Sequence, residues 1–526
     1  MFSRHALAPF IPFTLAALAA AVSATMALAG SAQAASDNNA HNSTGAKTST
    51  SGLANGVVAS NLPTLYFAGL PVDAGSRAST IQISNAWFNP NNPAETNIIK
   101  VTWYHRWGSP LTPQFITLAP HQSISLVTPG DRDTYSAIVE AETGKAIAGM
   151  ASMAVSYENT ANATRVAYSG MEAVSQLQSG QLIPLWHKAN YGWGSVIRVF
   201  NPAAQPLKFE MTFHVVGQPN INCRKTVSLG GFDTTEINPS GVTCLPAGSA
   251  GSASIRAYYV DAYNHETGPA LAAASYEQYY VDAASGEQSM IASSAPKVSS
   301  RDASGSDILF APLIQNNNYN WLSGILADRL TGTGNMLIDY YYKGGGSTPC
   351  TQHSNADVWP FVRAPLFPDN STCADEKVLS ARISSEVNGV RYLAAQINQT
   401  NVLNASGYPA IAAPGKRIYV PLLQNAVANN VPQQTSGIQL QNTSTTTAAQ
   451  VSITYYDINR VASTVEVETI PANGFLTLPK TGYPFPTNVS NAEISSTTPL
   501  AAVVNIIKVA AACSDCILTY VPTMLD

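Results

Sequence analysis

The sequence is poor in charged side chains. Asp, Glu, Lys and Arg make up 11% of its 526 residues, less than half of the ~25% typical of soluble domains. The net charge is −5, so the chain lacks the basic excess of nucleic-acid-binding domains. Hydrophobic residues reach 45%, which excludes charge-driven disorder. We therefore expect a folded protein that binds no nucleic acid and has a surface of uncharged polar side chains and tyrosine.

Motifs for catalysis and metal binding are also lacking. The histidines form neither H-E-x-x-H nor H-x-H, and there is no G-x-S-x-G elbow. Asp131 and Asp133 form a D-x-D pair, but nothing nearby completes the spacing of a calcium loop. We predict no catalytic residue, no cofactor and no metal site.

Long apolar runs are absent except near the N-terminus. Arg4 and His5 precede an apolar run that ends in Ala32-Gln33-Ala34, a small-x-small cleavage pattern. We predict a signal peptide over 1–34, with an uncleaved anchor as the alternative, and a flexible linker over 35–60. No later run reaches the ~20 apolar residues of a membrane helix. The expected product is exported, without a transmembrane segment after cleavage, and extracellular or at the cell surface; the periplasm is an alternative.

Internal repetition is the strongest feature that the sequence does have. The segment Ser79–Asn85 recurs as Ser195–Asn201 and Ser436–Asn442, with a weaker copy at Ser323–Arg329. The first serines of these copies lie 113 to 128 residues apart. Four copies at domain-sized intervals indicate tandem repeats.

The repeated segments have the pattern of half-buried strands. Polar and apolar side chains alternate in them, and each is followed by an alternating aromatic segment; these segments are 101–104, 211–214, 337–341 and 452–456. Helical periodicity is missing, and Asn, Pro and Gly turns separate the segments. We predict an all-β chain of four tandem antiparallel β-sandwiches, each with its own core, over 61–178, 179–303, 304–414 and 415–526.

The repeats also resemble a known class of protein. A Pro-Leu pair precedes three of the copies, at Ile183–Leu185, Ala311–Leu313 and Val420–Leu422, and the last unit ends with an apolar strand at Leu500–Val504. This pattern, clearest over 418–505, resembles the tandem immunoglobulin-like repeats of exported bacterial surface proteins. The resemblance implies an immunoglobulin-like fold and a structural, adhesive or scaffolding role. It assigns no functional residue.

Six cysteines follow the predicted signal peptide, an even number that favours disulfides in an exported chain. Cys223 and Cys350 occupy equivalent positions in two repeats, as do Cys244 and Cys373, so we predict the pairs Cys223–Cys244 and Cys350–Cys373. Cys513 and Cys516 form a C-x-x-C between two strand-like runs. A small disulfide loop at a hairpin tip fits this position better than a redox site, which needs a helix N-terminus.

Two equivalent segments each carry a tyrosine and a tryptophan, namely Tyr191 with Trp193 and Tyr319 with Trp321. Such rings can stack on sugars, so these four residues are candidate glycan-binding residues. The alternative, which the sequence favours, is a structural role in which they cover a sandwich end or a domain junction.

The core strands repeat whereas the loops diverge, a pattern that favours scaffolding over a binding site shared by every repeat. We therefore expect a secreted or cell-surface structural or adhesive protein without catalytic activity. An array of glycan-binding modules is the first alternative, and a hydrolase with a site at a domain junction is the second. Other proteins or cell-envelope polysaccharide are the expected partners, and self-assembly is possible.

Overall fold

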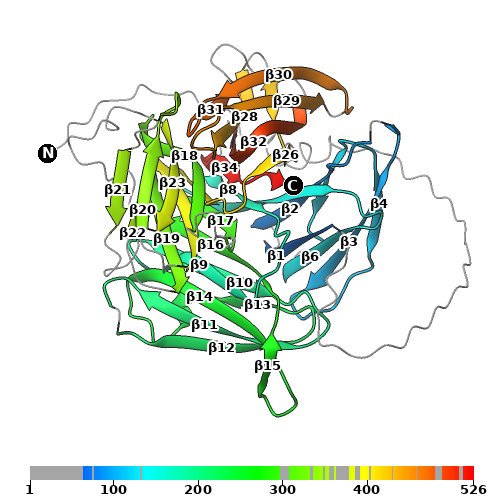
Figure 1. Cartoon of the computed structure of the whole chain (residues 1–526). Coiled ribbons are helices and arrows are strands. Elements are labelled where there is room, and N and C mark those ends of the chain that lie inside the picture. The colour runs from blue at the N-terminus through cyan, green and yellow to red at the C-terminus, as the bar shows by residue number, and fades with distance from the viewer. Residues whose placement is uncertain are drawn as a thin grey trace, which may run out of the picture. The chain divides into compact units, whose positions relative to one another are not determined.

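The computed structural model (Figure 1) describes residues 63–525 apart from 74–75, 90, 131–132, 219, 297–306, 332–335, 347–349, 355–360, 363–377, 386–390, 402–403, 429–430, 458, 480–488 and 509–512. The predicted signal peptide and the predicted linker lie outside these residues. In the part that is described, no helix has the length and apolar character required to cross a membrane.

Almost every strand pairing is antiparallel, so the prediction of an all-β chain is confirmed. In chain order the strands fall into four sets, which we call set 1 to set 4. Set 1 contains β1 (Thr64–Val72), β2 (Arg77–Asn85), β3 (Asn97–His105), β4 (Gln114–Leu118), β5 (Ser123–Val127), β6 (Asp133–Ala141), β7 (Ile147–Glu158) and β8 (Thr164–Glu172). Set 2 contains β9 (Gly180–Lys188), β10 (Trp193–Phe200), β11 (Leu207–Val215), β12 (Cys223–Leu229), β13 (Thr234–Ile237), the short 3₁₀ helix η2 (Pro239–Gly241), β14 (Ser249–Val260), β15 (Glu266–Pro269), β16 (Ala273–Val281) and β17 (Gln288–Ser294).

The second half of the chain continues the series. Set 3 contains β18 (Ile308–Asn318), β19 (Trp321–Thr331), β20 (Met336–Tyr341), β21 (Cys350–Ser354), β22 (Phe361–Val362), β23 (Val378–Ser385), β24 (Arg391–Asn401) and β25 (Asn404–Pro409). Set 4 contains β26 (Gly415–Val420), β27 (Asn425–Ala428), β28 (Val431–Asn442), β29 (Ala449–Asp457), β30 (Ala462–Ile470), β31 (Phe475–Leu478), β32 (Val489–Lys508), β33 (Cys513–Asp515), β34 (Ile517–Tyr520) and β35 (Thr523–Met524).

The four sets share one order of strand pairing. In set 1 the sheets are β1-β6-β3-β4 and β8-β7-β2-β5; in set 2 they are β9-β14-β11-β12 and β17-β16-β10-β13. Set 3 has β18-β23-β20-β21 and β25-β24-β19-β22. Set 4 has β26-β32-β29-β30 and β34-β32-β28-β31, with the long β32 pairing in both sheets. The two sheets of each set enclose a hydrophobic cluster, which is sandwich architecture. The immunoglobulin-like subtype and the domain boundaries stay predictions.

The repeated serine lies in the second strand of sets 1 to 3 and in β28 of set 4, and it bonds that strand to a segment that precedes it. In three sets its Oγ accepts a hydrogen bond of 2.7–2.9 Å from a backbone N–H; the pairs are Ser195 with His187, Ser323 with Gln315 and Ser436 with Gln424. In set 1 the equivalent residue is Pro71, which has no N–H, and the hydroxyl of Ser79 instead donates to the Pro71 carbonyl at 2.8 Å. These serines are buried, so the most regular feature of the repeat satisfies backbone polar groups.

One strand from each set, the last strand in sets 1 to 3 and β34 in set 4, forms part of a closed circuit of contacts. Strand β8 packs against β17, β17 against β25, β25 against β34, and β34 against β8. Small residues permit this approach. A Cβ on Gly170 of β8 would lie 2.6 Å from the Thr519 carbonyl oxygen of β34, and one on Gly407 of β25 would lie 2.7 Å from Cγ2 of Ile291 in β17.

The hydrophobic clusters cross from set to set. Met150 of set 1 belongs to the cluster of set 4, Val503 of set 4 belongs to that of set 3, and Met290 of set 2 belongs to that of set 1. The described residues between 63 and 525 accordingly belong to one compact unit. The expectation that every sandwich has a core of its own is therefore wrong in one respect, because neighbouring sandwiches complete each other's cores.

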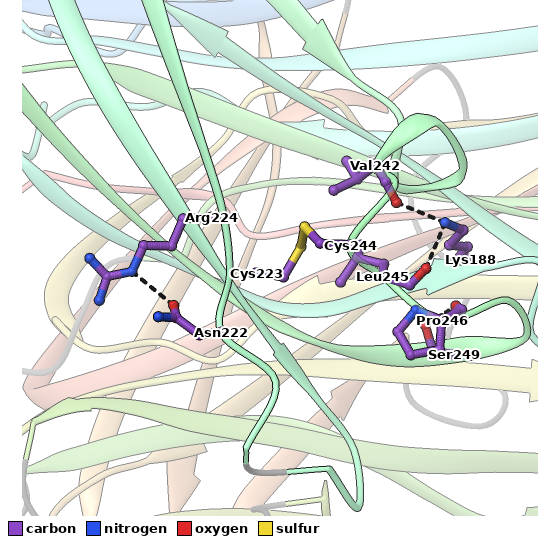
Figure 2. The surroundings of a disulfide bond; sticks show 9 residues. All are labelled: Lys188, Asn222, Cys223, Arg224, Val242, Cys244, Leu245, Pro246 and Ser249. Atoms are coloured by element: carbon purple, nitrogen blue, oxygen red, sulfur yellow. Dashed lines mark hydrogen bonds between the residues drawn. A yellow bond between two sulfur atoms is a disulfide. The ribbon is translucent and has the colours of Figure 1, made fainter.

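One predicted disulfide is confirmed. Cys223 and Cys244 are bonded, with their Cα atoms 5.5 Å apart (Figure 2). Cys350 and Cys516 each also take part in a disulfide bond, but the partner of each is not identified. Cys373 and the side chain of Cys513 lie outside the described residues, so the pairs Cys350–Cys373 and Cys513–Cys516 stay predictions.

Candidate ligand-binding cleft

A cleft of about 800 Å³ lies where set 2 meets set 3. Its walls come from the hairpin of β9 and β10, from the segment before β14, and from the start of β19 and the end of β24. The residues on which the following argument depends are His187, Tyr191, Trp193, Gln278, Leu322 and Asn398.

The tip of the β9–β10 hairpin is a tight turn that presents a tyrosine. Asn190 and Trp193 exchange two backbone hydrogen bonds of 3.0 Å. Between them Tyr191 and Gly192 have φ angles of 51° and 84°, as a type I′ turn requires. Gly192 suits this conformation because it lacks a Cβ. The Tyr191 side chain is 91% exposed and stands at the rim of the cleft.

Trp193 lies half-buried in the wall, below this turn. Its ring centroid is 5.7 Å from that of His187 and 5.4 Å from that of Tyr280. Burial of His187 lowers the pKa of its imidazole to about 4, so the imidazole is neutral near pH 7. The wall therefore combines an aromatic face with an uncharged ring nitrogen.

The disulfide holds the opposite wall. Residues 246–250, which follow Cys244 directly, line the cleft. Lys188 Nζ donates hydrogen bonds of 2.8 Å to the carbonyls of Val242 and Leu245, on both sides of Cys244 (Figure 2). Ser249 Oγ donates to the Pro246 carbonyl at 2.6 Å. These bonds fix a segment that has no strand pairing of its own before β14 begins.

Two carboxamides from different sets meet in the cleft. Asn398 Nδ2 of β24 donates to Gln278 Oε1 of β16 at 2.9 Å. Gln278 Nε2 and Asn398 Oδ1, like His187 Nδ1, have no hydrogen-bond partner among the described residues. An unsatisfied buried polar atom costs about 1–3 kcal/mol. These three atoms have almost no accessible surface, so a ligand in the cleft does not contact them.

The lining has no formal charge. The described residues that line the cleft include no Asp, Glu, Lys or Arg, and the low pKa of His187 keeps its ring neutral. A charged ligand would find no counter-ion in this wall, and its desolvation would go uncompensated. The cleft therefore suits a neutral, polar ligand with an apolar face.

Only two of the four aromatic residues predicted from the sequence line the cleft. Tyr191 and Trp193 line the cleft, whereas Tyr319 and Trp321 do not belong to its lining. Tyr319 is 87% exposed on the equivalent turn of β18 and β19, at a φ of 51°, and Trp321 is half-buried. No local signal in the sequence pointed to His187, Gln278 or Asn398, because these residues come together only where the two sets meet.

A second cavity, of about 360 Å³, lies at the ends of β8, β17, β25 and β34. Burial raises the pKa of its one carboxyl, Glu172. Glu172 Oε1 accepts hydrogen bonds from the hydroxyls of Ser293 and Ser294 and from the Ser294 N–H. This carboxyl is thus already engaged within the protein. Within the described part of the chain, no group of three or more His, Cys, Asp and Glu side chains could hold a metal ion.

Comparisons with known proteins give little guidance. No family model and no curated protein matches the chain. One solved structure, a tetra-tandem repeat in the extending region of a large adhesion protein, is similar at 12% identity over 82% of this chain and 92% of its own, with a TM-score of 0.10. Another, tripeptidyl peptidase 2, is similar at 9% identity over 89% of this chain and 40% of its own, with a TM-score of 0.14. TM-scores this low support no conclusion about fold or function.

Proposed function

We propose that this chain is a non-catalytic, extracellular adhesive protein that binds neutral carbohydrate in the cleft between set 2 and set 3. The observation that carries the proposal is the half-buried Trp193 ring, with the exposed Tyr191 at the rim, in a lining without formal charge. Cell-envelope or host-surface polysaccharide is the proposed partner. The predicted signal peptide and the disulfides support export.

Carbohydrate has both an apolar face and polar hydroxyls, and the cleft suits both. A pyranose ring has an apolar face of C–H groups that packs on an aromatic ring, and hydroxyls around its edge that both donate and accept hydrogen bonds. Trp193 supplies the ring, while the exposed Gln218 and Thr400 of the lining carry groups that donate and accept hydrogen bonds. Tyr191, exposed at the rim, is placed to contact a further sugar of a longer chain.

The closed circuit supports an adhesive role rather than a loose string of modules. Each sandwich contacts two neighbours through its strand in the circuit, which holds the cleft walls in fixed positions although they come from different sets. Pre-organisation of this kind reduces the entropy lost on binding. We propose that the four sets are the four domains predicted from the repeats.

A pair of tryptophan variants tests the proposal. Trp193→Ala is expected to lower retention of the full chain on neutral polysaccharide at least tenfold, because it removes the stacking face of the cleft. Trp321→Ala is the matched control, since Trp321 occupies the equivalent turn position outside the cleft lining. Affinity electrophoresis through polysaccharide gels measures both, and thermal unfolding shows whether each variant remains folded. Equal retention of wild type and Trp193→Ala would contradict the proposal.

A further inference from the structure

Each sandwich has an edge strand at the outer end of the sheet that contains its first strand. These edge strands are β4, β12, β21 and β30. Of the strands that the structure describes, only β11 pairs with β12 and only β29 pairs with β30. The other side of β12 and of β30 is therefore left without a paired strand, and such an edge is a template on which a further strand can form hydrogen bonds.

Charge distinguishes two of these four edges from the others. β12 carries Arg224 and Lys225, whereas β30 carries Glu466 and Glu468. β4 and β21 contain no Asp, Glu, Lys or Arg. Opposite charges on paired strands attract, and like charges directly opposite each other are destabilising. The charges therefore oppose pairing of β12 with β12 or of β30 with β30, and they favour pairing of β12 with β30.

The charged side chains of the two edges also lie on matching faces. Lys225 pairs directly with the buried Met211, and Glu466 pairs directly with the buried Ile453. Directly paired residues point to the same face of a sheet, so Lys225 and Glu466 both lie on the core-facing side, at its outer margin. An antiparallel pairing with Lys225 opposite Glu466 would therefore bring opposite charges together on one face.

The same register covers apolar side chains on the other face of β30. Val465 and Val467 are 59% and 70% exposed. The register places Thr226 opposite Val465 and Arg224 opposite Val467. The guanidinium of Arg224 lies 3.4 Å from Glu210 within its own sheet, so Arg224 contributes its aliphatic stem to the contact rather than its charge. Opposite charges on one face and apolar contacts on the other thus act together.

We propose that a second copy of this chain adds its β12 to β30, so that molecules associate head to tail through one continuous sheet. β12 and β30 belong to set 2 and set 4, which are not neighbours in the circuit, and one molecule therefore presents both edges at once. Because the contact joins two different surfaces, each added copy presents a new edge and the association repeats. Such assembly does not depend on the ligand in the cleft.

Charge reversal on each edge tests this pairing by sedimentation velocity on the full chain, over a range of concentrations. The wild type is expected to form oligomers larger than dimers. Glu466→Lys with Glu468→Lys leaves two basic edges, and Arg224→Glu with Lys225→Glu leaves two acidic edges. Each double variant alone is expected to associate at least tenfold more weakly, because like charges then face each other. An equimolar mixture of the two is expected to regain the wild-type oligomers, since edges of opposite charge are available again.

A control variant separates the edge from the net charge. Glu142→Lys with Glu158→Lys changes the net charge as the first double variant does, at exposed positions outside both edge strands, and is expected to associate like the wild type. Thermal unfolding shows whether each variant is folded, and Glu468→Lys alone or Lys225→Glu alone replaces a double variant that is not. A wild type that stays monomeric at every concentration, or equal weakening by the control, would overturn the proposal. So would a mixture of folded variants that fails to associate.

Discussion

Tyr191 shows how a single residue can carry information about function. A positive φ is uncommon for a residue other than glycine, and it costs on the order of 1 kcal/mol for a bulky side chain. With 91% of its side chain exposed, Tyr191 does not recover this cost by packing within the protein. Tyr319 repeats the arrangement, with a φ of 51° and 87% exposure. Asn or Gly would suit both turns better, so an aromatic side chain there supports a role in binding.

The buried imidazole of His187 predicts how the stability of the protein changes with pH. Burial lowers the pKa of its imidazole to about 4, whereas the unfolded chain has the ordinary value near 6.5. As pH falls below about 6.5, the unfolded state takes up a proton first, so the free energy of unfolding decreases until the pH reaches about 4. At about 1.4 kcal/mol per pKa unit, the loss is about 3 kcal/mol.

The measurement is urea unfolding of the wild type and of His187→Gln at pH 7 and pH 4.5. Because other titrating groups are common to both proteins, the difference between them isolates the imidazole. The variant is expected to lose less stability on acidification than the wild type, by about 2–3 kcal/mol. An identical pH dependence in the two proteins would contradict the burial of His187.

At the scale of elements, the Cys223–Cys244 disulfide affects the cleft because it anchors one of the walls. Cys223 begins β12, and Cys244 directly precedes the lining segment 246–250. Replacing both cysteines by serine is expected to cost about 2–4 kcal/mol of stability, since a cross-link over 21 residues restricts the unfolded chain. It is also expected to weaken retention on neutral polysaccharide, because the wall gains freedom. Affinity electrophoresis on the variant, below its unfolding temperature, separates the two effects; unchanged retention would show that the hydrogen bonds of Lys188 and Ser249 are enough to fix the wall.

Much of the fold at this scale could be predicted from sequence. The alternating segments around Ser79, Ser195, Ser323 and Ser436 were assigned to strands, and these serines lie in β2, β10, β19 and β28. The pair Cys223–Cys244 followed from equivalent positions in two repeats and is confirmed. Both predictions rest on local pattern and on repetition, which a single sequence contains.

At the scale of the whole molecule the sequence says much less. Gln278 and Asn398 are 120 residues apart, and no periodicity links them. They meet because set 2 packs on set 3, and side chains on both surfaces decide that packing. The closed circuit was missed for the same reason. In the sequence Gly170 does not differ from other strand glycines. Only the structure shows that a Cβ on Gly170 would lie 2.6 Å from the Thr519 carbonyl oxygen.

Gly170 therefore tests whether the circuit closes in solution. Gly170→Ala would drive its methyl group into the Thr519 backbone, where β8 of set 1 meets β34 of set 4. Because backbone cannot move aside as a flexible side chain can, the expected loss of stability is about 1–3 kcal/mol. Gly437→Ala is the matched control, since this strand glycine of β28 has its nearest contact at an ordinary 3.5 Å from the Leu478 carbonyl oxygen. Chemical unfolding of both variants measures the difference. If set 1 and set 4 were separate in solution, Gly170→Ala would be as mild as the control, and the circuit would be open at that junction.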